Sequence, residues 1–119
     1  MTVDGEARDI AGYSVSVANS PRYGGGMRLV PHADIADGRL DVITIERFPK
    51  LGFLRVFPRV FRGGHVGHPA VHFFKGHTVE LRADRPFVVW ADGEPIARLP
   101  ATVGVLPRCL RVVAPPLVP

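Results

Sequence analysis

Apolar and polar side chains alternate along the first clear element of the chain, where Tyr13, Val15 and Val17 are separated by small side chains. This period of two predicts a half-buried strand that ends at the turn Asn19-Ser20-Pro21. The β-branched run from Leu40 to Glu46 predicts another strand. Turn signals separate the remaining expected strands, which cover residues 27–30, 70–74, 77–82, 87–91, 95–99, 101–106 and 110–113.

The pattern changes its period over residues 49–62. Apolar residues there recur at helical spacing, and Pro49 is well placed at a helix start. Pro58 lies inside the pattern and should kink the helix or split it into two short ones, and Gly63-Gly64 should end it. These elements predict a mostly β protein, an antiparallel β-sandwich or flattened barrel with one helical crossover. We expect one β-rich domain over residues 1–119.

Composition narrows the class of protein. With 119 residues and 46% hydrophobic content, the chain can bury a core without disulfide bonds. No apolar run reaches the roughly 18 residues that a membrane-spanning helix needs. The polar start of the chain resembles no secretory signal, and a lone cysteine fits a reducing compartment, so we expect a cytoplasmic protein. The proline-rich residues 114–119 are expected to fray.

The net charge of +4 comes mostly from arginine, because the only lysines are Lys50 and Lys75. A basic surface suits phosphate, nucleic acid or anionic lipid. The alternative is a coding sequence whose base composition favours arginine. The chain has no dense basic block and no aromatic-studded basic strand, which argues against a nucleic-acid partner.

Two acidic turns carry the candidate chemistry. Asp92-Gly93-Glu94 joins two expected strands, and Asp-Gly favours a tight turn because glycine accepts a positive φ. On an extended segment both carboxylates would leave the same side, which suits metal–phosphate chemistry; the alternative is a solvated turn. The second acidic turn runs from Asp34 to Asp41. The run Gly24-Gly25-Gly26 supplies either a positive φ or a close backbone approach to a partner.

These motifs occur in the order found in a known family. The matching residues are Val17-Ala18-Asn19, Gly24-Gly25-Gly26-Met27, Pro31-His32-Ala33, Asp37-Gly38-Arg39-Leu40-Asp41, Gly64-His65 and Asp92-Gly93-Glu94. Over about residues 11–115 the chain resembles the C-terminal domain of the bacterial diacylglycerol kinase and sphingosine kinase superfamily of lipid kinases. Each motif is short, and their order and spacing make the resemblance specific.

The resemblance implies roles for both acidic turns. Asp92 would be the general base or a metal-linked acid at the cleft where ATP, Mg²⁺ and the lipid hydroxyl meet, with Glu94 beside it in the same network. The other turn would hold a structural Mg²⁺, and the alternative there is an Asx-turn before a strand. The ligands of that ion would be Asp34, Asp37 and a carbonyl near Arg39 or Leu40.

One part of the family's pattern has no counterpart here. Family members begin with a nucleotide-binding domain whose glycine-aspartate-glycine-threonine loop handles the ATP phosphates. We therefore expect the substrate-binding half of a lipid kinase, inactive alone, that binds a lipid and pairs with a nucleotide-binding half or with itself. ATP would bind only together with that half, and the inner membrane face is a further expected partner. The open alternatives are a stand-alone lipid-binding module and an interaction protein that completes its fold on a second chain.

Other residues have both a structural and a chemical interpretation. Cys109 has no catalytic partner and is expected to be buried and inert, and Trp90 is expected in the core. The aromatic helix residues Phe48, Phe53, Phe57 and Phe61 should pack on the sheet, with any surplus lining an acyl-chain pocket or facing a membrane. Surface or turn positions are favoured over a zinc site for the histidines, which have no Cys or Glu at ligand spacing: His65, His68, His72 and His77.

Overall fold

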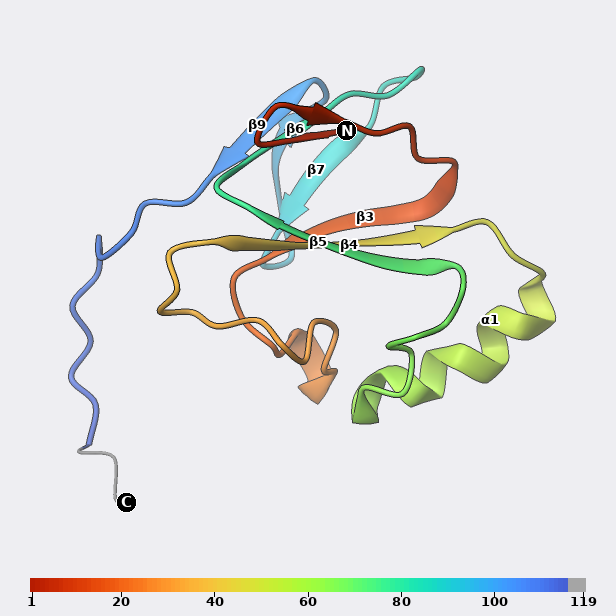
Figure 1. Cartoon of the computed structure of the whole chain (residues 1–119), viewed down its shortest axis with the longest axis horizontal. Helices are drawn as coiled ribbons and strands as arrows, with labels where there is room; N and C mark the ends of the chain where they lie inside the picture. The colour runs from red at the N-terminus through yellow and green to blue at the C-terminus, as the bar shows by residue number, and fades with distance from the viewer. Residues whose placement is uncertain (116–119) are drawn as a thin grey trace.

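Strand β4 (Leu40–Glu46) is central in the computed structural model, which describes residues 1–115 (Figure 1). It pairs antiparallel with β3 (Gly12–Ala18) along one edge and with β5 (Val71–Gly76) along the other. The first five residues of β4 are buried on both faces of the sheet. This double burial suits the β-branched residues of β4, although Asp41 and Thr44 are buried as well, whereas the edge strand β3 alternates.

A second antiparallel sheet has the strand order β2–β1–β6–β9. One side of it packs on one face of β4, where Val3 and Val79 meet Leu40 and Val42 in a shared hydrophobic cluster. Burying such a side chain stabilises the fold by about 1.5–3 kcal/mol. The two sheets form the predicted β-sandwich, and the described residues form no closed barrel. The strands of this sheet are β1 (Thr2–Val3), β2 (Glu6–Ala7), β6 (Thr78–Leu81) and β9 (Ala101–Gly104).

The opposite face of β4 is covered by a loop. Val30 and Ala33 of this loop pack with Ile43 of β4 and Val71 of β5. The predicted strand over residues 27–30 is wrong, because only an isolated bridge forms there and the chain then continues in bends and turns. The apolar residues of the segment are used to cover the sheet, so tertiary packing outweighs their preference for a strand.

The chain passes from β4 to β5 through α1 (Lys50–Val56) and the 3₁₀ helix η2 (Phe57–Arg62). The prediction that Pro58 splits the helical segment is confirmed, since Pro58 lies in the first turn of η2. Gly63 ends η2 with a φ of 75°, a left-handed conformation that glycine adopts without a Cβ penalty. The segment lies below the β3–β4–β5 sheet in the view of Figure 1, and each helix has a single buried residue.

A separate hairpin of β7 (Val88–Ala91) and β8 (Glu94–Arg98) forms its own two-stranded sheet. All of its strand residues are exposed except Val89, which is partly buried. An isolated two-stranded hairpin is marginally stable in water. A covering partner would therefore stabilise this hairpin.

The later strands are found where the pattern places them, with bounds shifted by a residue or more. Residues 110–113 are the exception: the predicted strand there is wrong, and the segment is exposed and irregular. The pattern also does not predict the β1–β2 hairpin, because a strand of two residues shows no period. Most of the segment predicted to fray, residues 114–119, lies outside the described residues.

Candidate functional site

The turn that leads into β4, residues 34–40, is closed by its own carboxylates. Asp34 Oδ1 accepts a hydrogen bond from the Ala36 N–H at 2.8 Å, and Asp37 Oδ1 accepts one from the Arg39 N–H at 2.8 Å. Both are Asx-turns, in which a short side chain bonds to the backbone two residues further on. They leave the second oxygen of Asp37 available for another partner.

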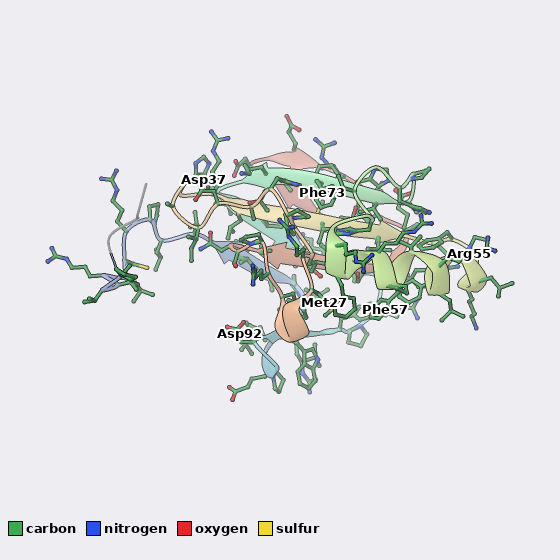
Figure 2. All side chains as sticks on the ribbon, turned by 90° about the horizontal axis from the view of Figure 1, so that it is seen from below. Met27, Asp37, Arg55, Phe57, Phe73 and Asp92 are labelled. Carbon is green, nitrogen blue, oxygen red and sulfur yellow. The ribbon has the colours of Figure 1, made fainter. Side chains whose placement is uncertain are left out.

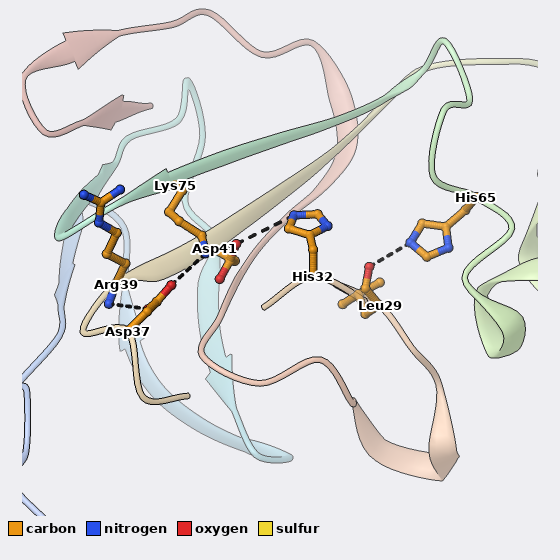
Figure 3. A network of polar contacts seen from close by, with 7 residues as sticks. All are labelled: Leu29, His32, Asp37, Arg39, Asp41, His65 and Lys75. Carbon is orange, nitrogen blue, oxygen red and sulfur yellow. Dashed lines mark hydrogen bonds and ion pairs between the residues drawn. The ribbon is translucent and has the colours of Figure 1, made fainter. Parts of the chain in front are cut away.

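Lys75 of β5 is that partner. Its Nζ donates to Asp37 Oδ2 at 2.7 Å and lies 3.5 Å from Asp41 Oδ1 (Figure 3). The register of β4 and β5 places Lys75 directly opposite Asp41. The hydrogen bond from Lys75, and after it the one from the Arg39 N–H, holds the pKa of Asp37 below its usual range. The same bond to Asp37 raises the pKa of Lys75.

Asp41 is the buried member of this group. Its side chain is 1% exposed, and neither of its oxygens accepts a hydrogen bond from the described residues. His32 Nε2 lies 3.7 Å from Asp41 Oδ1. A buried carboxylate is costly unless a nearby cation compensates it, so the Lys75 ammonium makes this burial tolerable. We call Asp37, Asp41, Lys75 and His32 the Asp37 cluster.

The predicted magnesium ligands all belong to the turn beside this cluster. Asp34 and Asp37 each give one oxygen to an Asx-turn, and Leu40 is 6% exposed in the sandwich core. Carboxylate and carbonyl oxygens are donors of the kind that Mg²⁺ prefers. Lys75, however, already holds the remaining oxygen of Asp37. Residues 1–115 contain no group of three or more His, Cys, Asp or Glu side chains that could hold a metal ion. An ion in this turn would have to compete with the Lys75 ammonium.

The second acidic turn is the tip of the β7–β8 hairpin, where Figure 2 labels Asp92. Asp92 and Gly93 have φ values of 50° and 88°, the left-handed conformations of a tight hairpin turn. The expectation of an extended segment from 92 to 94 is therefore wrong, and the alternation argument for a shared side does not apply. Asp92 and Glu94 are both exposed, and neither forms a side-chain hydrogen bond or ion pair with the described residues.

Large apolar side chains along the hairpin and just before it are also exposed. Phe87, Trp90 and Ile96 are 49%, 64% and 62% exposed. The prediction that Trp90 lies in the core is therefore wrong. Apolar side chains gathered on one exposed element are typical of a surface that a partner covers. The hairpin thus combines two uncompensated carboxylates with an uncovered apolar surface.

An apolar hollow of about 400 Å³ lies between β3 and α1, lined by Tyr13, Lys50, Phe53 and Leu54. The Tyr13 hydroxyl donates to the Phe48 carbonyl at 2.9 Å, and its ring packs edge-on against Phe53 with centroids 6.1 Å apart. Ligand pockets typically measure about 300–1,000 Å³. Three apolar side chains and one cation at the rim suit an amphiphile with an acyl chain and a polar head. Sequence reasoning missed the contribution of Tyr13, which comes from a distant strand.

Aromatic rings continue from the hollow along η2. Phe53 stacks on Phe57 with centroids 5.7 Å apart, and Phe57 meets Phe61 edge-on at 6.4 Å. Phe57 and Phe61 are each 46% exposed. Packing on the sheet therefore accounts for only part of this aromatic stripe, and the surplus rings face solvent.

Burial and backbone geometry decide three smaller expectations. His65 lies in a turn, as one of the two predicted alternatives has it, but its side chain is 1% exposed and donates from Nε2 to the Leu29 carbonyl at 2.7 Å, so a surface position is excluded. Cys109 is exposed, which contradicts the expected burial. In the short turn η1 (Gly24–Gly26) the last two glycines have φ values of 73° and 81°, and no neighbour lies within 4 Å of an added Cβ. Positive φ therefore explains Gly25 and Gly26.

Known proteins match nearly the whole chain. A family model described as YegS C-terminal NAD kinase beta sandwich-like domain matches residues 1–114. A Mycobacterium tuberculosis protein named diacylglycerol kinase is 32% identical over 97% of this chain and 37% of its own length. The putative lipid kinase YtlR of Bacillus subtilis is 28% identical over 81% of this chain and 31% of its own length. A probable lipid kinase YegS-like of Shewanella frigidimarina is 29% identical, and the corresponding shares are 87% and 33%.

The chain spans about a third of the length of these relatives. No solved structure gives a significant match. Within residues 1–115, no helix is both long enough and apolar enough to cross a membrane.

Proposed function

Because the chain belongs to the family of YegS C-terminal NAD kinase beta sandwich-like domains, we propose that it is the substrate-binding part of a lipid kinase. Such an enzyme would transfer a phosphoryl group from ATP to a lipid hydroxyl. The observation that carries the proposal is the match of 97% of the chain to a protein named diacylglycerol kinase. Other relatives are named lipid kinases as well, so the family supports the reaction class more firmly than it supports one lipid.

The hollow between β3 and α1 is the proposed place for the lipid. Tyr13, Phe53 and Leu54 offer an apolar lining for an acyl chain, and Lys50 lies at the same hollow. A lysine can bury its methylene stem while its ammonium reaches a polar head group. Each buried methylene of an acyl chain contributes about 0.8 kcal/mol, so a short length of chain would bind measurably.

The Asp92 turn is the proposed contribution to the chemistry. Its two carboxylates are exposed and have no partner within the described residues, so they are free to face a nucleotide-binding part. Asp92 would accept the proton of the attacking lipid hydroxyl or hold the metal, and Glu94 would adjust the charge of Asp92. Mg²⁺, when bound there, would neutralise phosphate charge. Without the nucleotide-binding part, we expect little or no kinase activity from this chain.

The structural Mg²⁺ is proposed for the other turn. Its donors would be Asp34, Asp37 and a carbonyl near Arg39 or Leu40, and its role would be to neutralise the carboxylates that close the turn. Lys75 already supplies one positive charge at Asp37. We therefore propose that the ion and the ammonium compete, and that this turn tolerates the loss of the ion.

The exposed hairpin is the proposed contact with the nucleotide-binding part. In the absence of that part, the apolar side chains of Phe87, Trp90 and Ile96 should drive self-association at moderate concentration. Sedimentation velocity over a range of concentrations measures this directly. Trp90→Ser should shift the chain toward monomer, while Leu106→Ser, at a residue that is 75% exposed outside the hairpin, should not. A chain that is monomeric at every concentration would argue against an uncovered partner surface.

The proposal can be tested by joining the chain to a nucleotide-binding part from a relative. In a chimera, this chain would replace the matching third of the Mycobacterium tuberculosis relative. Transfer of labelled phosphate from ATP to diacylglycerol in mixed vesicles would then be measured for the chimera, for this chain alone and for the remainder of the relative alone. We expect activity from the chimera and none from either part.

The second candidate is a lipid-binding module without catalysis, and the apolar hollow is the observation that favours it. A chimera that folds and binds lipid but transfers no phosphate would support this candidate over the kinase. An active chimera would exclude it.

A further inference from the structure

The solvent face of the α1–η2 segment carries a row of exposed apolar side chains. Leu51, Leu54, Pro58 and Phe61 follow one another at intervals of three or four residues, which places them on one face of a helical segment. Leu51 is 80% exposed and Leu54 is 68% exposed. Side chains of this size are rarely left in water in an unbroken row, so the row is a candidate contact surface.

A row of cations runs beside the apolar row. Arg55, Arg59 and Arg62 have the same helical spacing, and all three are exposed. Lys50 adds a further cation at the start of α1, and residues 47–64 contain no acidic residue. Figure 2 shows Arg55 and Phe57 on this part of the molecule, away from the aspartate at position 37. The surface therefore combines leucine and phenylalanine side chains with positive charges and no negative ones.

We propose that this surface, the Leu51–Arg62 face, docks the protein onto a bilayer that contains anionic lipid. An amphipathic segment with apolar side chains on one side and Lys/Arg beside them is the usual form of an interfacial anchor. The leucines would enter the head-group region, while the arginines would bind lipid phosphates with their planar, multi-donor guanidinium groups. The lack of any acidic residue in 47–64 gives the charge complementarity that selects an anionic surface.

The position of the face also relates it to the hollow. Leu54 belongs to both, and Lys50, which also lines the hollow, is exposed directly before the face begins. A bilayer against this face would present its acyl chains next to the hollow. The docking itself requires neither ATP nor a kinase reaction, so it is tested separately from the proposed function.

Vesicle binding by the chain alone tests the inference. Sedimentation with vesicles of phosphatidylcholine is compared with sedimentation with an equimolar mixture of phosphatidylcholine and phosphatidylglycerol, at low and high salt. We expect binding to the anionic vesicles that weakens with salt, because exposed charges are screened. Equal binding to both kinds of vesicle, or no binding to either, would overturn the proposal; the latter would leave an acidic protein as the partner to seek.

Two pairs of variants locate the contact, each with a matched control elsewhere on the surface. Arg55→Gln/Arg59→Gln should weaken binding on the order of 10-fold or more, at about 1 kcal/mol for each cation near an anionic surface, whereas Arg82→Gln/Arg111→Gln should have a smaller effect. Leu51→Ser/Leu54→Ser should weaken binding strongly, whereas Leu106→Ser/Leu110→Ser should not, although Leu106 and Leu110 are 75% and 80% exposed. Equal losses in test and control pairs would overturn the assignment of this face.

A fluorescence measurement tests insertion without relying on affinity. Trp90 is the only tryptophan, so Trp90→Phe/Leu54→Trp places a single indole on the Leu51–Arg62 face. Brominated acyl chains in anionic vesicles should quench this indole, and Trp90→Phe/Leu106→Trp serves as the control that stays unquenched. Quenching confined to the control would overturn the proposal. All the substituted leucines and arginines are exposed, so the variants should fold, and circular dichroism verifies this.

Discussion

Two Asp-Gly turns in this chain share a local sequence signal and differ in their surroundings. Asp37 has one oxygen on the Arg39 N–H and the other on Lys75 at 2.7 Å, next to Asp41, which is 1% exposed. Asp92 stands at the tip of an exposed hairpin and has no such partner within the described residues. The chain compensates the first carboxylate internally and leaves the second one uncompensated.

This difference distinguishes a carboxylate that stabilises the fold from one that is available to a ligand, and the shared Asp-Gly motif alone does not. A carboxylate held by its own turn and by a lysine lowers the free energy of the folded state, and a substitution there acts on stability. A carboxylate without partners contributes little to stability and is free to act on a ligand. We therefore expect the Asp37 cluster to stabilise the fold and the Asp92 turn to carry the proposed chemistry, and thermal measurements on the chain alone can test the first expectation.

The largest thermal effect is expected from Lys75→Met. Methionine keeps the apolar stem but removes the charge, which leaves Asp41 buried with only His32 as a possible cation. The melting temperature should fall by about 5 °C or more, because an uncompensated buried charge is strongly destabilising. The matched control is Lys50→Met, which removes the other lysine from an exposed position and should change the melting temperature by about 2 °C at most. Equal effects in both variants would contradict the role of the Asp37 cluster.

A smaller effect is expected from acid. The pKa of Asp37 is held below its ordinary value of 3.8, chiefly by Lys75. The pKa of Asp4 is also lowered, chiefly by the Thr78 N–H and then by the His77 N–H. Groups with a lowered folded-state pKa stabilise the protein above their unfolded-state pKa and lose that contribution as pH falls through the folded-state pKa.

The melting temperature should therefore be flat above about pH 5 and fall below about pH 4 as these carboxylates take up protons. Asp37→Asn should reduce the slope without abolishing it, since Asp4 still titrates. Differential scanning calorimetry across this range gives both slopes. If the unsubstituted chain and Asp37→Asn lose stability in parallel, then the bond between Lys75 and Asp37 has no net effect on folding.

The smallest thermal effect is expected from chelation. In the unsubstituted chain Lys75 donates to Asp37 Oδ2, the oxygen that the Asx-turn does not use. EDTA should therefore change the melting temperature by about 2 °C at most. In Lys75→Met the competing ammonium is gone, and Mg²⁺ should raise the melting temperature in a saturable manner that Asp37→Ala abolishes. A Lys75→Met variant that does not respond to Mg²⁺ would remove the metal from this turn.

The sequence predicts the parts of the fold that depend on local patterns. Strand β4 can be predicted because it is rich in β-branched residues, and the break at Pro58 follows from the chemistry of proline. The β1–β2 hairpin cannot be predicted from the sequence pattern, because its strands are two residues long. The segment over residues 27–30 has the composition of a strand but covers β4 as a loop, because packing against the sheet outweighs its local preference for a strand.

The candidate site is predictable only in part for the same reason. The turn chemistry of Asp37 and Asp92 can be read from Asp-Gly, but the partner of Asp37 cannot, because Lys75 reaches it through the register of two strands. The exposure of single side chains is equally hard to predict from the sequence. Trp90 is exposed and His65 is buried, although their residue types suggest the opposite. Long-range pairing and burial are set by the whole sandwich, and no local window of sequence contains them.

The measurement that tests the central claim most directly is the turnover of Asp92→Asn in the active chimera. The amide keeps the shape of the side chain but cannot accept a proton or neutralise a metal, so kcat should fall about 10²–10⁴-fold. The melting temperature should be unchanged, because Asp92 has no partner to lose within the described residues. Asp84→Asn is the matched control, since its side chain is 87% exposed just before the hairpin, and it should keep full turnover. Full turnover in Asp92→Asn would contradict the account and remove this turn from the chemistry.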